Sequence, residues 1–512
     1  MQTRNPCWCG WRGIAAAWCV SLCSVLLGAA PLPRSTPEAQ GVASGAVLAL
    51  VEALDKEVES MHSLMIVRHG QVIAEGWWTP YGSEHNHVLF SLSKSFTSTA
   101  VGMAVAEGKL SIDDRVMSHF PGDMPSAPGE NLKAMRVRDL LTMSTGHQDE
   151  PPTSPDQVSA QSFLAMPVPH KPGTHFKYNT AATFMLSALV QKVTGQTVAD
   201  YLRPRLFEPL GIERPVWDAN FQGISLGGYG LRVRTEDIAK FGQLYLQGGR
   251  WEGKTLLTPE WVALATSRQV SNGSNPDSEW DQGYGFQFWR CRHGAYRGDG
   301  AFGQFSVVMP SQDTVVAITS GTGKMGKVLE VIWDKLLPAL QQSATLPVDR
   351  TAQEALRRRL ATLEVAPARG TAAPGQAATA CNGRYAFATN PLGWESLAVQ
   401  LEPGTKRLNL TIQDRGKTFT LTSGHGQWLR GRGTVAAGVL APRAEEPMAG
   451  TYGWENDTTC VVKACAYETP FHITYRLTFA GDQVTVQAQN NVAFGPTEHP
   501  TLTGRRTAAM RE

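Results

Sequence analysis

Apolar and polar positions alternate between helical and strand-like spacing from about residue 36 to residue 345. Residues 46–61 place apolar side chains at the spacing of one helix face, which predicts an amphipathic helix. Two short apolar runs follow, 64–67 and 72–74, separated by a His-Gly pair. Two apolar runs joined by a glycine turn predict a β-hairpin.

The end of this region repeats the strand pattern. Strands are predicted at 305–309 and 314–318, and a helix at 328–340. Because strands stand at both ends of the region with helices between them, we expect the two ends to join one sheet. The prediction is a mixed helix and sheet domain over residues 36–345.

The pattern changes beyond this domain. Residues 366–379 lack large apolar side chains, and this composition predicts a linker. From residue 380 the period becomes two, as where Leu408, Leu410 and Ile412 alternate with polar residues. Repeated hairpins of this kind predict a small all-β domain over residues 380–510 that folds separately, so truncation after about residue 365 is expected to leave an active core.

The first thirty residues have a different pattern. Arg4 and Arg12 precede the apolar run 13–27, which ends in small residues at 28–30. A positive segment, a short apolar segment and small residues are typical of a secretory signal peptide. We therefore expect residues 1–30 to be removed on export to the periplasm or the extracellular space, leaving no stable membrane span.

Composition and charge exclude several classes of protein. Of the 512 residues, 42% are hydrophobic and 18% are charged, which rules out a mostly disordered chain. Forty-seven Lys and Arg residues oppose 45 Asp and Glu residues, and no long basic block occurs, so a nucleic-acid partner is not indicated.

The cysteines and histidines give no metal-binding pattern. Neither Cys-x-x-Cys nor His-Glu-x-x-His occurs, so no metal site is predicted. Four cysteines remain after the leader, an even number that permits disulfides in an oxidising compartment. Cys460 and Cys465 lie close in sequence and are candidates to pair with each other.

The sharpest chemical signal is Ser91-x-x-Lys94, at the start of a segment of small and apolar residues that predicts a buried helix. Side chains three residues apart on a helix share a face, so Ser91 and Lys94 can form a hydrogen bond. Burial disfavours the charged form of a lysine, and the lowered pKa lets it take a proton from a serine hydroxyl. Alone, the pattern also fits a helix-capping serine with a lysine in solvent.

Further segments give this motif a context. A Tyr178-Asn-Thr180 sequence follows it, and a glycine-rich sequence, Asp299-Gly300-Ala301, leads into the predicted strand 305–309. Together with residues 138–147 and 231–242, these segments resemble the serine β-lactamase and penicillin-binding-protein superfamily. The resemblance covers roughly residues 36–345.

The resemblance implies a fold and a set of roles. The fold is α+β, with an antiparallel sheet flanked by helices and a mostly helical subdomain, here followed by the all-β domain. Ser91 would be the nucleophile, with Lys94 and Tyr178 moving the protons, either of them as the initial base. The backbone N–H groups of Ser91 and Ala301 would hold the oxyanion. Thr180, Asp299 and Gly300 are then expected to contact the substrate.

Two positions depart from the pattern of the superfamily. Thr180 stands where many relatives have Asn, and Gly298 stands where relatives have Lys or His. That missing side chain helps hold a substrate carboxylate in the relatives. Arg297 is one residue away, but strand alternation would point it to the other face. The departure weakens the case for β-lactam hydrolysis more than the case for acyl transfer.

Other residues offer alternatives. Ser225 lies in a Gly-x-Ser-x-Gly sequence, the nucleophile pattern of α/β-hydrolases, but it lacks the strand before it and the helix after it, so a flexible loop is favoured. His147 and His175 lie near the motifs, and a structural role is favoured for both.

The sequence therefore predicts an exported serine hydrolase that cleaves an ester or amide of a small molecule or peptide. It needs no metal or organic cofactor. A carboxylesterase or D-peptidase is favoured, with a β-lactamase or DD-carboxypeptidase as the alternative. A non-catalytic penicillin- or peptidoglycan-binding module is the alternative of another class.

Overall fold

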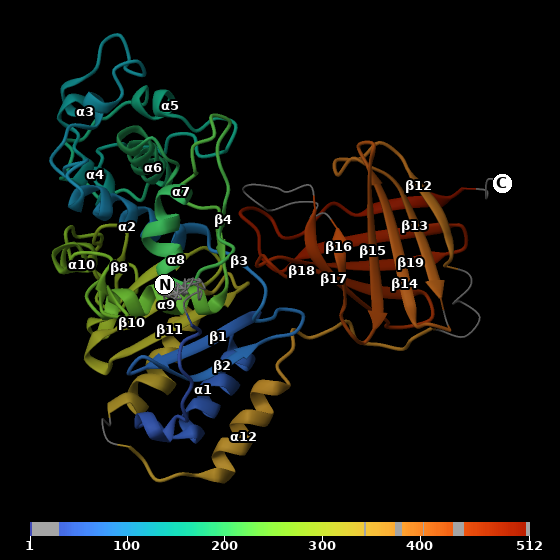
Figure 1. The fold of residues 1–512 in the computed structure, drawn as a ribbon. Coiled ribbons are helices and arrows are strands. Elements are labelled where there is room, and N and C mark those ends of the chain that lie inside the picture. The colour runs from blue at the N-terminus through green and yellow to red at the C-terminus, as the bar shows by residue number, and fades with distance from the viewer. Residues whose placement is uncertain (3–29, 342–344, 374–380, 403, 434–444, 508–512) are drawn as a thin grey trace.

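A computed structural model describes residues 1–2, 30–341, 345–373, 381–402, 404–433 and 445–507. Figure 1 shows two parts, a larger one of helices around a sheet and a smaller one made of strands. The predicted leader lies almost entirely outside the described residues. Among the described residues, no helix has both the length and the apolar character needed to cross a membrane.

The larger part is built on a six-stranded sheet whose neighbouring strands are all antiparallel. Strand β1 pairs with β11, with Ile66 opposite Val316, so the two ends of the domain join one sheet as the sequence predicts. In spatial order the strands are β2 (Gln71–Trp77), β1 (Met61–Arg68), β11 (Thr314–Ser320), β10 (Gln304–Met309), β9 (Tyr296–Gly300) and β8 (Trp289–Arg290).

Helices cover both faces of this sheet because its strands are apolar on both sides. Along β1, Met65 and Val67 join one buried cluster, whereas Leu64 and Ile66 join another. The first face packs on α2 (Ser93–Ala106) and α9 (Thr235–Leu246). The second packs on α1 (Ser44–Glu57), α11 (Met325–Val331) and α12 (Arg350–Ala361).

Two helices differ in their boundaries from the sequence prediction. Helix α1 ends at Glu57, four residues before the predicted end, because the chain enters strand β1 at Met61. The helix predicted at 328–340 begins at Met325 and changes to a π-helical turn at Ile332–Leu336. Hydrophobic spacing identified both helices but not their ends.

A helical subdomain stands above the sheet in Figure 1, with α6 at its centre. Ten consecutive residues of α6, 181–190, are buried, and α6 packs against α2. The subdomain contains α3 (Glu130–Ala134), α4 (Val137–Leu141), α5 (Ala160–Leu164), α6 (Thr180–Thr194) and α7 (Val198–Leu202). Nearby are α8 (Glu208–Leu210), α10 (Pro259–Thr266) and the short strands β3 (His87–Val88), β4 (Val216–Trp217), β5 (Leu231–Val233), β6 (Arg250–Trp251) and β7 (Lys254–Thr255).

The smaller part is a ten-stranded sheet within the described residues, and it confirms the predicted all-β domain. A parallel pairing of β15 with β17 closes the sheet into a barrel-like form. Alternate residues such as Leu410, Val462 and Leu477 fill its interior. The strands are β12 (Gly383–Phe387), β13 (Trp394–Glu402), β14 (Arg407–Asp414), β15 (Lys417–His425), β16 (Leu429–Gly433), β17 (Glu446–Trp454), β18 (Thr459–Ala466), β19 (His472–Ala480), β20 (Gln483–Asn490) and β21 (Leu502–Arg506).

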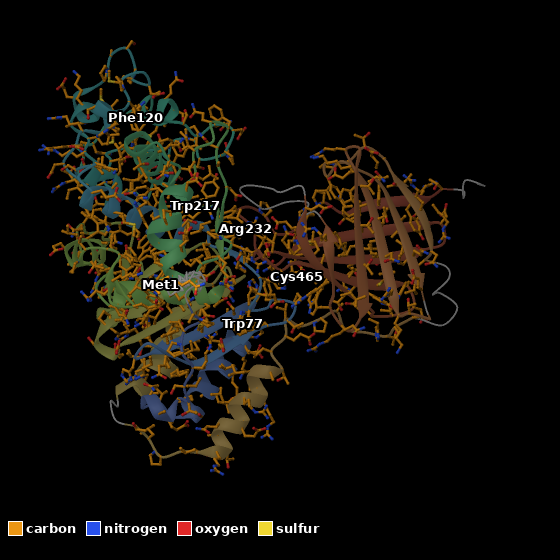
Figure 2. All side chains as sticks on the ribbon, in the orientation of Figure 1. Met1, Trp77, Phe120, Trp217, Arg232 and Cys465 are labelled. Carbon is orange, nitrogen blue, oxygen red and sulfur yellow. The ribbon has the colours of Figure 1, made fainter. Side chains whose placement is uncertain are left out.

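The two parts are in direct contact, as Figure 2 shows around Arg232 and Cys465. Arg232 in β5 forms a two-point ion pair with Glu446 in β17, with N–O distances of 2.7 and 2.8 Å, and both side chains are 1% exposed. The predicted linker also contacts the smaller part: Thr371 and Trp454 of β17 exchange two backbone hydrogen bonds. No pattern in the sequence predicted these contacts.

The four described cysteines are free, so the predicted pairing of Cys460 with Cys465 is wrong. Both lie in β18, and residues five apart in a strand point to opposite faces. Cys460 lies in the core of the smaller part, whereas the Cys465 thiol donates to the hydroxyl of Tyr81, with the sulfur 3.4 Å from the oxygen.

Candidate active site

Ser91 lies at the junction between a short 3₁₀ turn, Phe90–Leu92, and helix α2. Residues 93–104 of this helix are all buried, because small and apolar residues let it pack closely on every side. Phe90, directly before Ser91, has a φ of +46°, in the left-handed region that non-glycine residues rarely adopt. The Ser91 side chain is therefore held at the end of a rigid helix and borders a cavity.

Lys94 lies one helical turn further on, with its amine against the Ser91 hydroxyl. Its Nζ is 3.1 Å from Ser91 Oγ, 2.8 Å from the carbonyl oxygen of Gly228 and 3.4 Å from Thr180 Oγ1. Lys94 is 1% exposed, and this burial lowers the pKa of its amine to about 7. Near neutral pH a substantial fraction of the amine is uncharged and able to accept a proton.

Tyr178 covers the same amine from the other side. The Lys94 Nζ is 5.0 Å from the centre of its ring, and the ring stacks on Trp289 with centroids 5.4 Å apart. Burial raises the pKa of the Tyr178 phenol, and its hydrogen bond with Ser91 offsets only part of that rise. The phenol is therefore neutral at pH 7. The structure brings Ser91, Lys94 and Tyr178 together.

Ala301 borders the same cavity, in the turn between β9 and β10. Its carbonyl oxygen accepts a hydrogen bond of 3.0 Å from the Gln304 side chain, which fixes the turn. A Cβ on Gly300 would lie 2.0 Å from the carbonyl oxygen of Leu89, so only glycine fits at the approach to this turn. Ser91 and Ala301 thus both border the cavity, and their chain neighbours Phe90 and Phe302 are in contact.

Position 298 lies close to the start of helix α2. A Cβ on Gly298 would lie 2.1 Å from Leu92 Cδ1, so a larger residue there requires the Leu92 side chain to move. As strand alternation predicts, Arg297 lies on the other face, fully buried, with its guanidinium paired to Asp299 at 2.8 Å. Arg292 is paired with Glu279.

Asp299 borders the cavity, but its carboxylate already forms an ion pair with the guanidinium of Arg297. Burial raises the pKa of its carboxyl group, and the paired Arg297 lowers it. Glu150 is the other carboxylate on the cavity wall, and one of its oxygens accepts a hydrogen bond of 2.5 Å from the backbone N–H of Thr180. Of the predicted substrate-contacting residues, Thr180 and Asp299 line the cavity, whereas Gly300 supports the turn beside it.

The cavity has a volume of about 350 Å³, and half of its lining residues are aromatic. Its lining residues come from both domains and are Phe90, Ser91, Glu150, Tyr178, Thr180, Tyr229, Trp280, Trp289, Asp299, Ala301, Met325 and Phe494. The sequence analysis identified only Ser91, Tyr178, Thr180, Asp299 and Ala301 of this wall. Single aromatic residues in loops carry no signal that distinguishes them from core residues.

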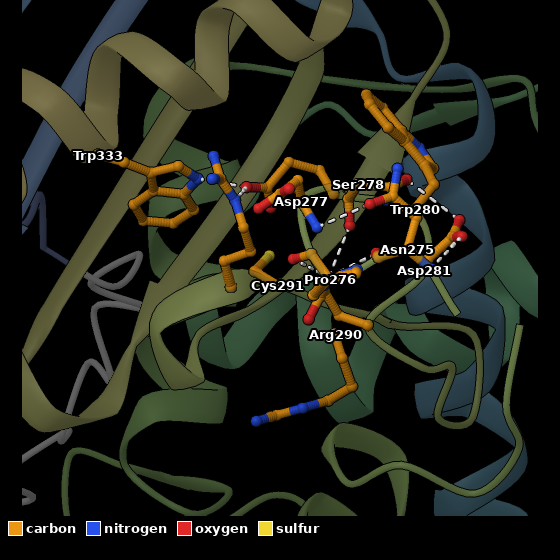
Figure 3. A network of polar contacts seen from close by, with 12 residues as sticks. Asn275, Pro276, Asp277, Ser278, Trp280, Asp281, Arg290, Cys291 and Trp333 are labelled. Carbon is orange, nitrogen blue, oxygen red and sulfur yellow. Dashed lines mark hydrogen bonds and ion pairs between the residues drawn. The ribbon is translucent and has the colours of Figure 1, made fainter. Parts of the chain in front are cut away.

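The loop that carries Trp280 is held by a polar network, drawn in Figure 3. Ser278 donates to Asp281 at 3.1 Å and accepts from the backbone N–H of Trp280 at 3.2 Å. Next to it, Glu279 accepts a hydrogen bond of 2.8 Å from Trp333. These contacts fix one aromatic wall of the cavity from behind.

Ser225 does not form a nucleophile elbow. It is buried, follows no long strand and precedes no helix, and its carbonyl accepts a hydrogen bond from Ser187. The glycine-rich loop around it has a different function: the carbonyl groups of Gly227 and Gly228 bind Thr97 and Lys94 of helix α2. The loop positions the lysine, a role that the sequence analysis missed.

The two histidines near the motifs do not line the cavity. His147 is buried with Nδ1 2.9 Å from Thr145 Oγ1, and His175 packs against His170. In the part of the chain that the structure describes, no group of three or more His, Cys, Asp or Glu side chains is arranged to hold a metal ion.

Comparisons with known proteins identify the family of the larger domain. The family model described as Beta-lactamase matches residues 49–341, more than half of the chain. The 6-aminohexanoate-dimer hydrolase of Paenarthrobacter ureafaciens is 23% identical over 58% of this chain and 83% of its own length. Penicillin-binding protein 4 of Amycolatopsis lactamdurans is 26% identical over 49% of this chain and 76% of its own.

A solved structure supports the fold. A Bacillus anthracis protein, titled provisionally as a 6-aminohexanoate-dimer hydrolase, superposes with a TM-score of 0.50 at 20% identity. The match covers 63% of this chain and 90% of that one.

Proposed function

The chain belongs to the β-lactamase family of serine hydrolases, and we propose that it hydrolyses an ester or amide through an acyl-enzyme on Ser91. One observation carries the proposal: the buried Lys94 amine lies 3.1 Å from the Ser91 hydroxyl, with a pKa near 7. A neutral amine in that position is a general base for the serine.

The reaction follows from the arrangement of these groups. Lys94 takes the proton of the Ser91 hydroxyl as Oγ bonds to the carbonyl carbon, and the negative charge that develops on the carbonyl oxygen is held by the N–H groups of Ser91 and Ala301. Donors of this kind contribute about 3 kcal/mol each. Lys94, with Tyr178 beside it, returns the proton to the leaving group, and water then releases the acyl group by the same steps in reverse order. We assign the initial base to Lys94, because burial keeps the Tyr178 phenol protonated.

The cavity favours neutral acyl substrates. Its described lining includes no Lys or Arg side chain, and the nearby Arg297 is already paired with Asp299. We therefore favour a carboxylesterase or D-peptidase over a β-lactamase or DD-carboxypeptidase. The relatives' names include an amide-dimer hydrolase and a penicillin-binding protein, so names alone do not decide between these activities.

A non-catalytic binding module is the weaker candidate. Such a module has no need of a lysine whose charge is suppressed by burial beside a serine, and here that costly arrangement is intact. We also propose that the protein is exported, on the strength of the signal-like pattern of residues 1–30. The mass of the mature N-terminus after expression tests this point.

A fluorophosphonate probe tests the nucleophile. Peptide mapping by mass spectrometry is expected to find the label on Ser91, and Ser91→Ala is expected to abolish labelling and the hydrolysis of p-nitrophenyl esters and D-peptides. Ser225→Ala is the matched control and should keep both. Labelling that persists in Ser91→Ala and disappears in Ser225→Ala would refute the assignment.

A further inference from the structure

The C-terminal domain reaches the candidate active site through one aromatic side chain. Phe494 lies in the segment between β20 and β21, and its ring borders the cavity together with Ser91 and Ala301. The side chain is 53% exposed, although most large apolar side chains of this protein are buried. An exposed phenylalanine on the wall of a cavity is available to contact a bound molecule.

The segment that carries Phe494 is fixed to the hydrolase domain. The Asn491 amide donates hydrogen bonds of 2.9 Å to the carbonyl groups of Gly321, in the hydrolase domain, and Pro470, and it accepts one of 2.8 Å from the backbone of His472. Val492, 3% exposed, is buried in the apolar cluster between the domains. These anchors lie two and three residues before Phe494, so its ring occupies a defined position.

The neighbours of Phe494 show which part of a substrate it would contact. Its ring packs against Phe90 and Phe302, with centroids 5.5 and 4.7 Å away, and these residues flank Ser91 and Ala301 in the chain. Tyr178 instead stacks on Trp289. Because Lys94 and Tyr178 must reach the leaving group, that group lies on their side, and the acyl group extends over Ala301 toward Phe494.

We propose that Phe494 is a specificity-determining residue that binds the acyl chain of apolar substrates, so that the C-terminal domain forms part of the active site. This proposal rests on the proposed function, since it assumes an acyl-enzyme on Ser91. A short acyl group such as acetyl ends close to Ser91. A longer acyl chain crosses the cavity and contacts the Phe494 ring. This contact stabilises the complex, because it removes apolar surface of both the acyl chain and the ring from water.

The experiment compares p-nitrophenyl acetate with p-nitrophenyl octanoate on the full-length protein. Phe494→Ala is expected to lower kcat/KM for the octanoate roughly tenfold, the order of a lost apolar contact in a pocket, with less than about a twofold change for the acetate. Phe494→Leu keeps an apolar side chain and should restore most of the ratio. Phe221→Ala is the control, because Phe221 is 64% exposed and is not a cavity-lining residue.

The outcomes separate this proposal from the proposed function. An unchanged octanoate-to-acetate ratio in Phe494→Ala, or an equal fall for both esters, overturns the specificity role while leaving Ser91 chemistry intact. If the wild-type protein and Ser91→Ala hydrolyse the esters equally slowly, the proposed function fails, and the Phe494 proposal fails with it.

Discussion

At the scale of single residues, the protonation of Lys94 is expected to set the pH dependence. The protonated Lys94 amine cannot accept a proton from Ser91, and the pKa of this amine is about 7. We expect kcat/KM for a neutral ester to rise about tenfold per pH unit below 7 and to level off above it. Stopped assays between pH 5 and 9 measure this.

Two variants identify the group that titrates. Tyr178→Phe should hydrolyse the ester more slowly but keep the same rise of kcat/KM below pH 7, called here the acid limb. The reason is that this rise reports the deprotonation of Lys94. Lys94→Ala should remove the limb along with most of the activity. A limb that survives in Lys94→Ala would assign the titration to another group.

The glycine at position 298 predicts a preference against anionic substrates. A charge-assisted hydrogen bond from a lysine there would contribute about 1.5–3 kcal/mol, or roughly 10- to 150-fold in binding. Arg297 and Arg292 do not replace it, because Asp299 and Glu279 hold them. We expect a lower kcat/KM for nitrocefin than for p-nitrophenyl butyrate on the same preparation, and the reverse order would sink this prediction.

At the scale of elements, the two turns that present Ser91 and Ala301 share one apolar cluster. Phe90 and Phe302 flank these residues, and their φ angles of +46° and +66° are costly for non-glycine residues, about 1–3 kcal/mol each. Phe471 of the C-terminal domain packs edge-on against both rings, at 6.1 and 5.6 Å. The cluster therefore holds the two strained turns that carry the proposed oxyanion donors.

This arrangement predicts a positioning role for Phe471. Phe471→Ala is expected to lower kcat about tenfold with a smaller change in KM, because misplaced donors weaken the transition state more than the bound substrate. Phe471→Leu should recover most of kcat. Phe387→Ala, in the same domain but packed against Trp394, is the control for a general loss of stability. Equal kinetic effects in the two alanine variants would contradict the prediction.

At the scale of the whole molecule, the buried ion pair of Arg232 with Glu446 joins the two domains. Removing one partner leaves an uncompensated buried charge, so Glu446→Ala should lower the free energy of unfolding by about 3–5 kcal/mol. The neighbouring Glu445 forms an exposed pair with Arg432, so Glu445→Ala should cost less than about 1 kcal/mol. Urea titration measures both. Similar midpoints for the two variants would show that the domain contact adds no stability.

Truncation after residue 365 gives the related test. The composition of the linker suggested that an active core would remain. The structure predicts the opposite, because truncation exposes Phe90 and Phe302 and leaves Arg232 without its carboxylate partner. We expect an insoluble protein, or a soluble one with greatly reduced ester hydrolysis. A soluble truncation with full activity would restore the view that the domains are independent.

The sequence by itself determined the elements and the chemistry that depend on local spacing. The three-residue separation of Ser91 and Lys94 puts both on one helix face, and alternation along β9 puts Arg297 opposite Gly298. The all-β domain followed from a period of two, but its closure by β15 and β17 did not. Local spacing did not determine the helix ends, because α1 ends where the chain approaches strand β1.

Only the tertiary structure decided which distant residues meet. The pKa of Lys94 depends on its burial beneath the Gly228 loop, and the cavity wall depends on loops whose aromatic residues resemble core residues in sequence. Phe494 reaches the cavity from a domain whose linker gives no sign of contact. Local patterns fix secondary structure through short-range geometry, whereas the docking of two domains depends on complementary surfaces that no stretch of sequence displays.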